Sequence, residues 1–161
     1  MRTLSLALAG VLVCVGTALA QTGDCNEAAA LVHADAGLSR AAAAIASRHA
    51  LKVLVAGSAS SILAGPGGTR AAYPVTLQSA LSKRLPGVAV SVVNTAKPRQ
   101  TATEMLASFG QVLAEQKPDL VIWQTGTVDA MRGIDVDQFR AALEKGVDQL
   151  ILCSHRSSPR S

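Results

Sequence analysis

Polar residues that could do chemistry follow each of three short apolar runs in this 161-residue sequence. Ser60 and Ser61 come soon after the first run, Asn94 directly after the second, and Asp129 in a short loop after the third. A serine in a tight turn behind a buried strand can present its hydroxyl at the edge of a sheet, where it can act as a nucleophile. Two simpler roles stay open, because Ser and Gly are ordinary loop formers and Asp129 could equally cap a helix or a turn.

Other kinds of site find little support in the sequence. The glycine-rich run at residues 65–68 matches neither phosphate-binding fingerprint, which disfavours a nucleotide site. No Cys-x-x-Cys or Cys/His cluster indicates a metal site, and His33 and His49 are interpreted as surface residues of a helical, Ala-rich stretch. We therefore expect no metal and no cofactor. Cys25 and Cys153 could form one disulfide bond in an oxidising compartment, which the sequence alone leaves open.

The elements that must position the polar residues alternate along the chain. The apolar runs are interpreted as buried strands at residues 52–56, 88–93 and 119–124, and amphipathic helices are expected near residues 74–85, 101–116 and 137–150. This alternation predicts parallel strands joined by right-handed crossovers, with the first strand central. Sites in open α/β sheets form at the carboxyl ends of the strands, where the polar residues are expected to lie.

Local signals indicate where these helices begin and which side chains they bury. Pro74 stands at a helix start, where proline is tolerated, and Thr101 with Glu104 forms a capping-box pattern. The last helix is expected to bury a face made of Phe139, Leu143, Val147 and Leu150. The predicted core comprises Val53, Leu54, Val55, Leu77, Leu81, Val90, Val92, Leu106, Phe109, Leu113, Val121, Ile122, Phe139 and Leu143.

The first 20 residues have the three-part pattern of a secretory signal peptide. Arg2 precedes an apolar run at residues 4–15, and Ala18-Leu19-Ala20 gives a cleavage pattern before Gln21. The apolar run is shorter than the about 20 residues of a membrane-spanning helix, so no stable membrane span is expected. We expect a periplasmic or secreted protein in which residues 21–50 form one broken helix or two short helices.

Composition argues against nucleic acid as the main partner. The net charge is +4, the chain has one Trp, one Tyr and two Phe, and no basic cluster is interleaved with these aromatic residues. The length suits a single domain with a core of its own.

The three strand-end loops together resemble those of the SGNH/GDSL hydrolase family, over residues 52–150. The family's first motif, Gly-Asp-Ser-x-x-x-Gly, matches best at residues 59–65, which makes Ser61 the implied catalytic nucleophile. Matching the motif from Gly57 instead would place Ala59 at the nucleophile, and no glycine would follow four residues later. In either match the Asp of the motif is replaced by a serine.

The remaining motifs of this family carry over unevenly. The oxyanion-hole glycine of the second motif falls near Arg99, whose backbone N–H could still donate. The Asn of the third motif, Gly-x-Asn-Asp, falls on Val128, which has no side-chain donor. The last motif, Asp-x-x-His, has no match, because His155 lacks an Asp three residues before it.

The resemblance implies an α/β fold, a three-layer αβα flavodoxin-like (SGNH hydrolase) sandwich with parallel strands, over residues 51–153. It is expected to be incomplete at the C-terminus and followed by a disordered tail at residues 154–161. Residues 151–153 are interpreted as the start of a strand that is cut off, or the chain as a natural short form. Such an open sheet edge would favour self-association.

The resemblance also implies a function. We expect an exported serine esterase that acts on small-molecule, carbohydrate or lipid esters and is weakly active or inactive in this form. The alternative is a non-catalytic binding module on the same fold.

Overall fold

The computed structural model describes residues 37–62 and 68–156. The chain divides into two compact units, Met1–Gly37 and Leu38–Ser161, and every helix and strand given below belongs to the second. The expected signal peptide at residues 1–20, Cys25 and His33 lie outside the described residues. His49 is exposed, directly after the first described helix.

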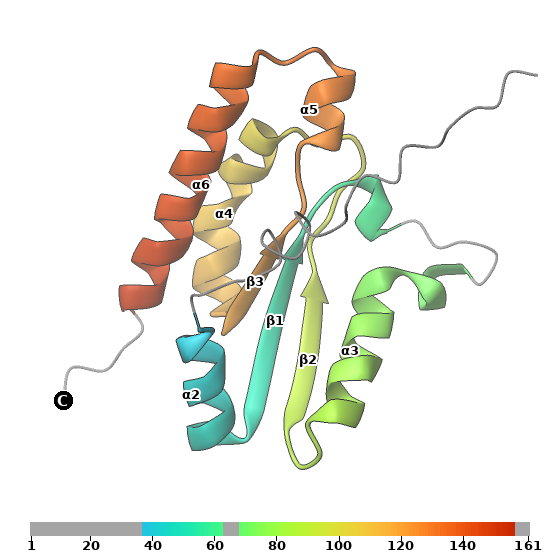
Figure 1. Ribbon diagram of the computed structural model, residues 1–161, viewed down its shortest axis with the longest axis vertical. Helices are drawn as coiled ribbons and strands as arrows, with labels where there is room; N and C mark the ends of the chain where they lie inside the picture. Colours follow the sequence, from blue (N-terminus) through green and yellow to red (C-terminus); the bar gives the residue numbers. More distant parts are fainter. Residues whose placement is uncertain (1–36, 63–67, 157–161) are drawn as a thin grey trace, which may run out of the picture. The chain divides into compact units, whose positions relative to one another are not determined.

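A three-stranded parallel sheet lies at the centre of this unit (Figure 1). Its strands are β1 (Ala50–Ala56), β2 (Ala89–Asn94) and β3 (Leu120–Trp123), in the order β2-β1-β3. The prediction of three parallel strands with the first one central is confirmed. The structure extends β1 by two residues at its start, and all of Val53, Leu54 and Val55 are buried there because neighbours cover both edges and both faces.

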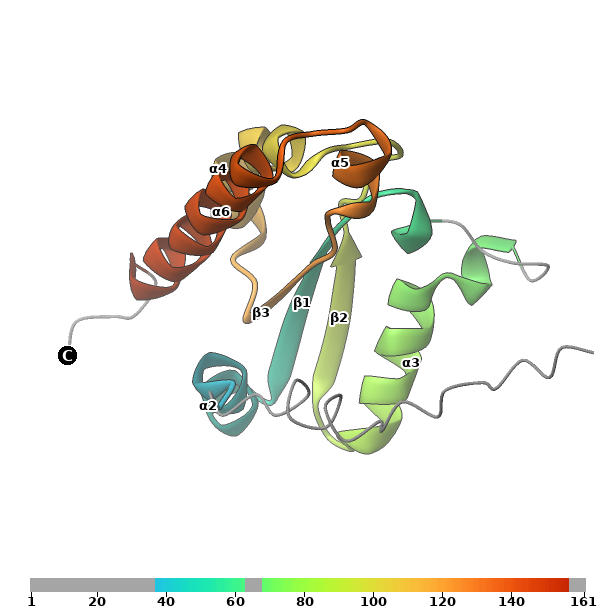
Figure 2. The same cartoon turned by 45° about the horizontal axis from the view of Figure 1, so that its top comes forward.

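Helices cover both faces of the sheet, which gives a three-layer α/β arrangement (Figure 2). The helices α4 (Ala102–Gln116) and α6 (Val136–Arg156) pack on one face, and α2 (Ser39–Arg48) and α3 (Tyr73–Arg84) pack on the other. Short helices lie in the intervening loops, namely η1 (Ala59–Ser61), η2 (Gly68–Ala71) and α5 (Thr127–Met131).

The predicted core residues populate both layers. Those that are buried, besides the β1 residues named above, are Leu106, Phe109 and Leu113 of α4. Those that are partly buried and pack against the two core clusters are Leu77, Leu81, Val90, Val92, Val121, Ile122 and Phe139. Alternation along β1 assigns Leu54 to the α4 and α6 side and Val53 to the α2 and α3 side.

The predicted helix starts are confirmed. Thr101 is the N-cap of α4, where its hydroxyl accepts from the Glu104 N–H at 3.3 Å and the Glu104 carboxylate accepts from the Thr101 N–H at 2.8 Å. These reciprocal bonds satisfy two donors that the first turn of a helix leaves free. Pro74 lies in the first turn of α3, where its missing N–H removes no helical hydrogen bond.

The inward face of α6 differs from the prediction. Ala142 and Gly146 are buried together with partly buried Phe139 and Leu150, whereas Val147 remains 46% exposed. Small residues occupy the inward face of α6 because this helix lies close against α4 and the end of β3. A larger side chain at Gly146 would collide with Trp123.

The C-terminal part of α6 also corrects the sequence analysis. Residues 151–153 continue the helix and do not begin a strand, and residues 154–156, expected in a disordered tail, belong to the same helix. Residues 157–161 lie outside the described residues.

Two side chains bond to the backbone of neighbouring elements. Buried Asp119 accepts from the Lys52 N–H at 2.9 Å and pairs with Arg48, which ties the starts of β1 and β3 to the end of α2. On the other edge of the sheet, Oε1 of Gln78 in α3 accepts from the Val92 N–H of β2 at 3.0 Å. Within the described ranges, no helix combines the length and apolar character that a membrane crossing requires.

Candidate active site

Ser61 joins the carboxyl ends of all three strands. It lies five residues after the end of β1, at the end of η1, and is 0% exposed. Its hydroxyl donates to Oε1 of Gln124, directly after β3, at 2.5 Å, and its carbonyl accepts from the side-chain amide of Asn94, at the end of β2, at 2.9 Å. Gly57 admits this packing, because a Cβ there would collide with the Ser61 hydroxyl. The structure therefore brings Ser61 and Asn94 together, as their positions after parallel strands predict.

The partner of the Ser61 hydroxyl limits its chemistry. An amide oxygen such as Oε1 of Gln124 accepts a hydrogen bond but does not take up a proton near neutral pH. A serine becomes a nucleophile when an adjacent general base removes its proton, as the imidazole does in Ser-His-Asp sites. In this conformation the hydroxyl is both buried and engaged, so it is neither exposed to an ester nor activated.

The loop from β2 to α4 runs against the loop that carries Ser61. The Lys97 N–H donates to the Gly57 carbonyl at 3.1 Å. Farther along, Arg99 is exposed and has a φ of 65°, in the left-handed region that favours glycine. Its carbonyl accepts from the Arg132 guanidinium at 2.8 Å, and Arg132 also donates to Glu104 at 3.1 Å. The position that the resemblance equates with a glycine thus has glycine-like backbone geometry with an arginine in place.

Glu104 carries a shifted pKa within this loop network. The hydrogen bond from the Thr101 N–H lowers the pKa of the Glu104 carboxyl below its usual value, and the Arg132 guanidinium lowers it further. The carboxylate form is therefore favoured where α4 begins, as expected for an acid in the first turn of a helix.

Asp129, the acid in the loop region after β3, has a structural role. Gly126 has a φ of 102° and precedes α5, and Val128 is half-buried in the first turn of that helix. Asp129 is 3% exposed, and its two carboxylate oxygens accept from the Ala102 N–H at 3.0 and 3.1 Å. Of the two roles that the sequence left open for Asp129, the structure gives it the capping role, at the start of α4.

Three residues with buried or hydrogen-bonded polar groups in this region, Gln124, Tyr73 and Thr125, were not predicted as site residues, and the first two contact Ser61. Gln124 is the first polar residue after the apolar run of β3, which is the signal that could have identified it. The Tyr73 hydroxyl is buried, and burial raises the pKa of Tyr73 above its usual value, an effect that the nearby Ser61 hydroxyl partly offsets. Thr125 also buries its hydroxyl at the end of β3.

An open groove of about 430 Å³ lies elsewhere, between α3 and the outer edge of β2. Its lining comprises Pro74, Val75, Gln78, Ser79, Ser82, Val92 and Asn94. Only Asn94 is shared with the Ser61 contacts, so the groove is not the site at the strand ends. Among the described residues, no three His, Cys, Asp or Glu side chains gather as metal ligands would.

Comparison with known proteins identifies the family. The model of the Non-GDSL lipase-like family matches residues 24–152. The chain belongs to this family. A search of curated proteins gives no match to this chain.

Solved structures share the fold of this Non-GDSL lipase-like chain, and two of the three below are named as esterases. The crystal structure of TesA matches with a TM-score of 0.58 and 28% identity, over 63% of this chain and 55% of TesA. AlinE4, an SGNH-hydrolase family esterase, matches with a TM-score of 0.55 and 26% identity, over 68% of this chain and 56% of AlinE4. The psychrotrophic esterase EstA from Pseudoalteromonas matches in fold, with a TM-score of 0.52 and 19% identity, over 63% of this chain and 54% of EstA. The chain thus spans about half the length of these structures.

Proposed function

We propose that this chain is an exported domain of the SGNH/GDSL esterase class that, within its 161 residues, hydrolyses esters weakly or not at all. Membership of the Non-GDSL lipase-like family and the fold shared with TesA and AlinE4 support the esterase class. Small-molecule, carbohydrate or lipid esters are the substrates that this class suggests.

The state of Ser61 carries the proposal of weak activity. Its hydroxyl is fully buried and donates to an amide oxygen, so it is not hydrogen-bonded to a base among the residues that the structure describes. The resemblance places the second donor of an oxyanion hole at Val128, which supplies no side-chain hydrogen bond, and removal of one such donor slows acyl transfer about 10²–10³-fold. The 161 residues also hold no Asp-x-x-His sequence that could provide a base with its orienting carboxylate.

Ester turnover tests this proposal. p-Nitrophenyl acetate hydrolysis would be measured with the purified protein, with Ser61→Ala and with Ser60→Ala. Ser60 is the matched control, because it lies in the same short helix but is exposed. We expect all three proteins to hydrolyse the ester at nearly the rate of buffer alone. A robust rate that disappears only in Ser61→Ala would refute the proposal and make Ser61 the nucleophile.

A non-catalytic binding module is the second candidate, and the same burial of Ser61 favours it. A binding module keeps the strand-end loops but needs no proton transfer. The two candidates differ in one measurement, because a binding module would hold an ester reversibly and return it intact. Equilibrium binding of a p-nitrophenyl ester without release of nitrophenolate would favour the binding module, and release without saturable binding would argue against it.

Export is a separate part of the proposal and rests on the signal-peptide pattern of residues 1–20. N-terminal sequencing of the exported protein is expected to begin at Gln21. Recovery of the full-length protein, soluble in the cytoplasm and absent outside it, would contradict export.

A further inference from the structure

A row of apolar side chains lies along one side of α6 and forms what we call the α6 stripe, made of Leu143, Val147 and Ile151. Val147 is 46% exposed and Ile151 is 49% exposed. Leu143 is partly buried but packs against neither core cluster of the described residues. A spacing of four residues puts the three side chains next to one another on the helix surface. Contiguous exposed apolar side chains are typical of a surface that contacts a partner.

The α6 stripe points away from α4. Gly146 marks the inward side of α6, because a Cβ there would collide with Trp123. Successive residues of an α-helix are rotated by about 100°, which puts Val147 on one side of Gly146 and Gln149 on the other. Gln149 buries its Oε1, so its side of the helix faces α4, the helix that packs beside α6. In Figure 1, α6 lies farther from β2 than α4 does, so the stripe points past the β3 side of the sheet.

The outer edge of β3 is open to a partner strand. Within the described ranges, β3 pairs with β1 and with no other strand. The Gln124 N–H donates to the Ala56 carbonyl of β1 at 2.9 Å, and bonding directions alternate along a strand, so the N–H groups of Val121 and Trp123 point away from β1. The four residues of β3 are apolar and include no charge or proline, which are the usual protections of an edge strand.

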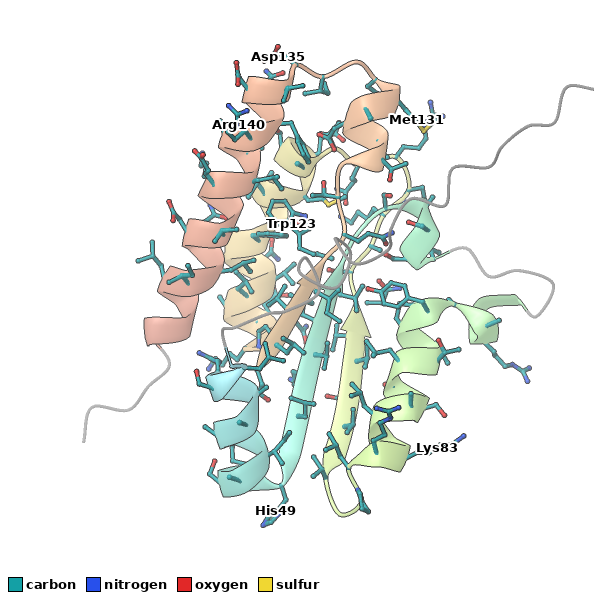
Figure 3. All side chains as sticks on the ribbon, in the orientation of Figure 1. His49, Lys83, Trp123, Met131, Asp135 and Arg140 are labelled. Carbon is teal, nitrogen blue, oxygen red and sulfur yellow. The ribbon has the colours of Figure 1, made fainter. Side chains whose placement is uncertain are left out.

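A single two-fold axis would serve both features. Trp123 lies against Gly146, which fixes the level of α6 relative to β3 (Figure 3). The helix runs opposite to the strand, as Figure 1 shows. A strand rises about 3.3 Å per residue and a helix about 1.5 Å, so the level of Ile122 corresponds to about residue 148 of α6. An axis at the outer edge beside Ile122 therefore also passes close to Val147, the centre of the α6 stripe.

We propose that two copies of this chain associate through β3 and the α6 stripe, antiparallel about this axis. The two β3 strands pair with each other, and the two three-stranded sheets join into one. The stripe is self-complementary, because Val147 lies opposite Val147 of the partner subunit and Leu143 lies opposite Ile151 of the partner subunit. The inference makes no use of Ser61 and is independent of the proposed function.

The size of the interface sets the expected affinity. Three side chains and a four-residue strand from each copy amount to less than the about 800 Å² per partner of a standard interface. We therefore expect a weak dimer with a dissociation constant of about 10–100 μM.

Sedimentation velocity of the full chain over a range of concentrations tests the association. We expect monomer well below the dissociation constant and dimer well above it. Val147→Glu should weaken the dimer about 100-fold or more, because it brings two carboxylates together at the axis in an apolar contact. Val75→Glu is the matched control, since Val75 is 50% exposed on α3, on the other face of the sheet, and should leave the dissociation constant unchanged.

Two further variants test the antiparallel register. Leu143→Lys and Ile151→Glu should each self-associate about tenfold more weakly than wild type, because each puts a charge against an apolar side chain. Mixed together, the two variants place the lysine opposite the glutamate and keep one apolar contact. The mixture should therefore associate about tenfold more tightly than either variant alone. Recovery in the mixture would also show that both variants are folded.

Amide hydrogen exchange followed by NMR tests the strand pairing. The N–H groups of Val121 and Trp123 should exchange more slowly as the concentration rises through the dissociation constant, because the partner strand then accepts from them. The Val92 N–H, which donates to Gln78 at the opposite edge of the sheet, should exchange at the same rate throughout.

The proposal is overturned if the chain stays monomeric at concentrations well above the expected dissociation constant. It is also overturned if Val75→Glu weakens the dimer as much as Val147→Glu does, or if mixing Leu143→Lys with Ile151→Glu restores nothing. A dimer in which Val121 and Trp123 exchange at the monomer rate would refute the pairing of the two β3 strands and with it the shared axis.

Discussion

Gly146 shows how closely α6 approaches the end of β3, and replacing it with alanine sets two known effects against each other. Alanine stabilises the interior of a helix by about 1 kcal/mol relative to glycine. A Cβ at Gly146, however, would lie 2.5 Å from Cη2 of Trp123 and 3.0 Å from Cδ2 of Leu106. The Trp123 ring has little freedom to move, because it makes an edge contact with Phe109 at 5.1 Å between ring centroids and donates from Nε1 to the Met105 sulfur.

Overpacking of a rigid core site destabilises by about 1–3 kcal/mol, which exceeds the gain in helix propensity. We therefore expect Gly146→Ala to lower the free energy of unfolding by about 1 kcal/mol. Gly110→Ala is the matched control, since Gly110 is exposed in α4 and a Cβ there would meet no atom within 4 Å. That variant is expected to gain about 0.5–1 kcal/mol.

Urea unfolding followed by circular dichroism measures both variants, and a change of 1 kcal/mol corresponds to about 4 °C in melting temperature for a domain of this size. Removing the ring isolates its contribution. In a Trp123→Leu background, Gly146→Ala should be neutral or stabilising, because the collision is gone. If Gly146→Ala alone is as stable as wild type, or if it destabilises equally with and without the Trp123 ring, the close approach of α6 does not determine the outcome and the reasoning is wrong.

Three further predictions concern single polar groups. Asp129→Ala should lower the free energy of unfolding by about 1–2 kcal/mol in urea titrations, because the Ala102 N–H loses its cap, and Asp129→Asn should lose less since one acceptor remains. The pKa of Glu104 is lower in the folded chain than in the unfolded chain. The contribution of its carboxylate to the free energy of unfolding is therefore complete above the unfolded pKa of about 4.3 and is lost as the pH falls through the folded pKa. Wild type should lose more stability than Glu104→Gln over that acidic range, as pH-dependent urea titrations would show. Ser61→Ala should destabilise by about 1 kcal/mol in thermal melts, because Oε1 of partly buried Gln124 loses its donor, and equal melting of Ser61→Ala and wild type would contradict this.

The parts of the fold that the sequence predicted correctly depend on neighbours in the chain. Residues 101–104 form a capping box among themselves, and the apolar runs of the strands are buried wherever a sheet places them. The errors concern long-range contacts. The choice of Ala142 and Gly146 for the inward face of α6 depends on Trp123, whose position no helical periodicity in α6 reveals.

The candidate site shows the same division. Parallel strands predict that Ser61 and Asn94 meet at one edge of the sheet, and they do. The partner of the Ser61 hydroxyl is 63 residues away in the chain, and the acceptor role of Asp129 serves a helix that begins 27 residues earlier. Residue type leaves such pairings open, because serine and aspartate have the same donors and acceptors in a catalytic site as in a structural contact.

The hydrogen bond from the Val92 N–H to Oε1 of Gln78 occupies a backbone donor on the edge strand β2. An outward N–H on an edge strand is the group that a foreign strand needs in order to extend the sheet. Here the side-chain amide of Gln78 in α3 accepts from this N–H, and Gln78 lies only 14 positions earlier in the chain. The protected edge therefore depends on one neighbouring helix and strand and needs no distant part of the chain. An incoming strand would have to break this bond first, so Gln78 opposes intermolecular β-pairing at the middle of β2.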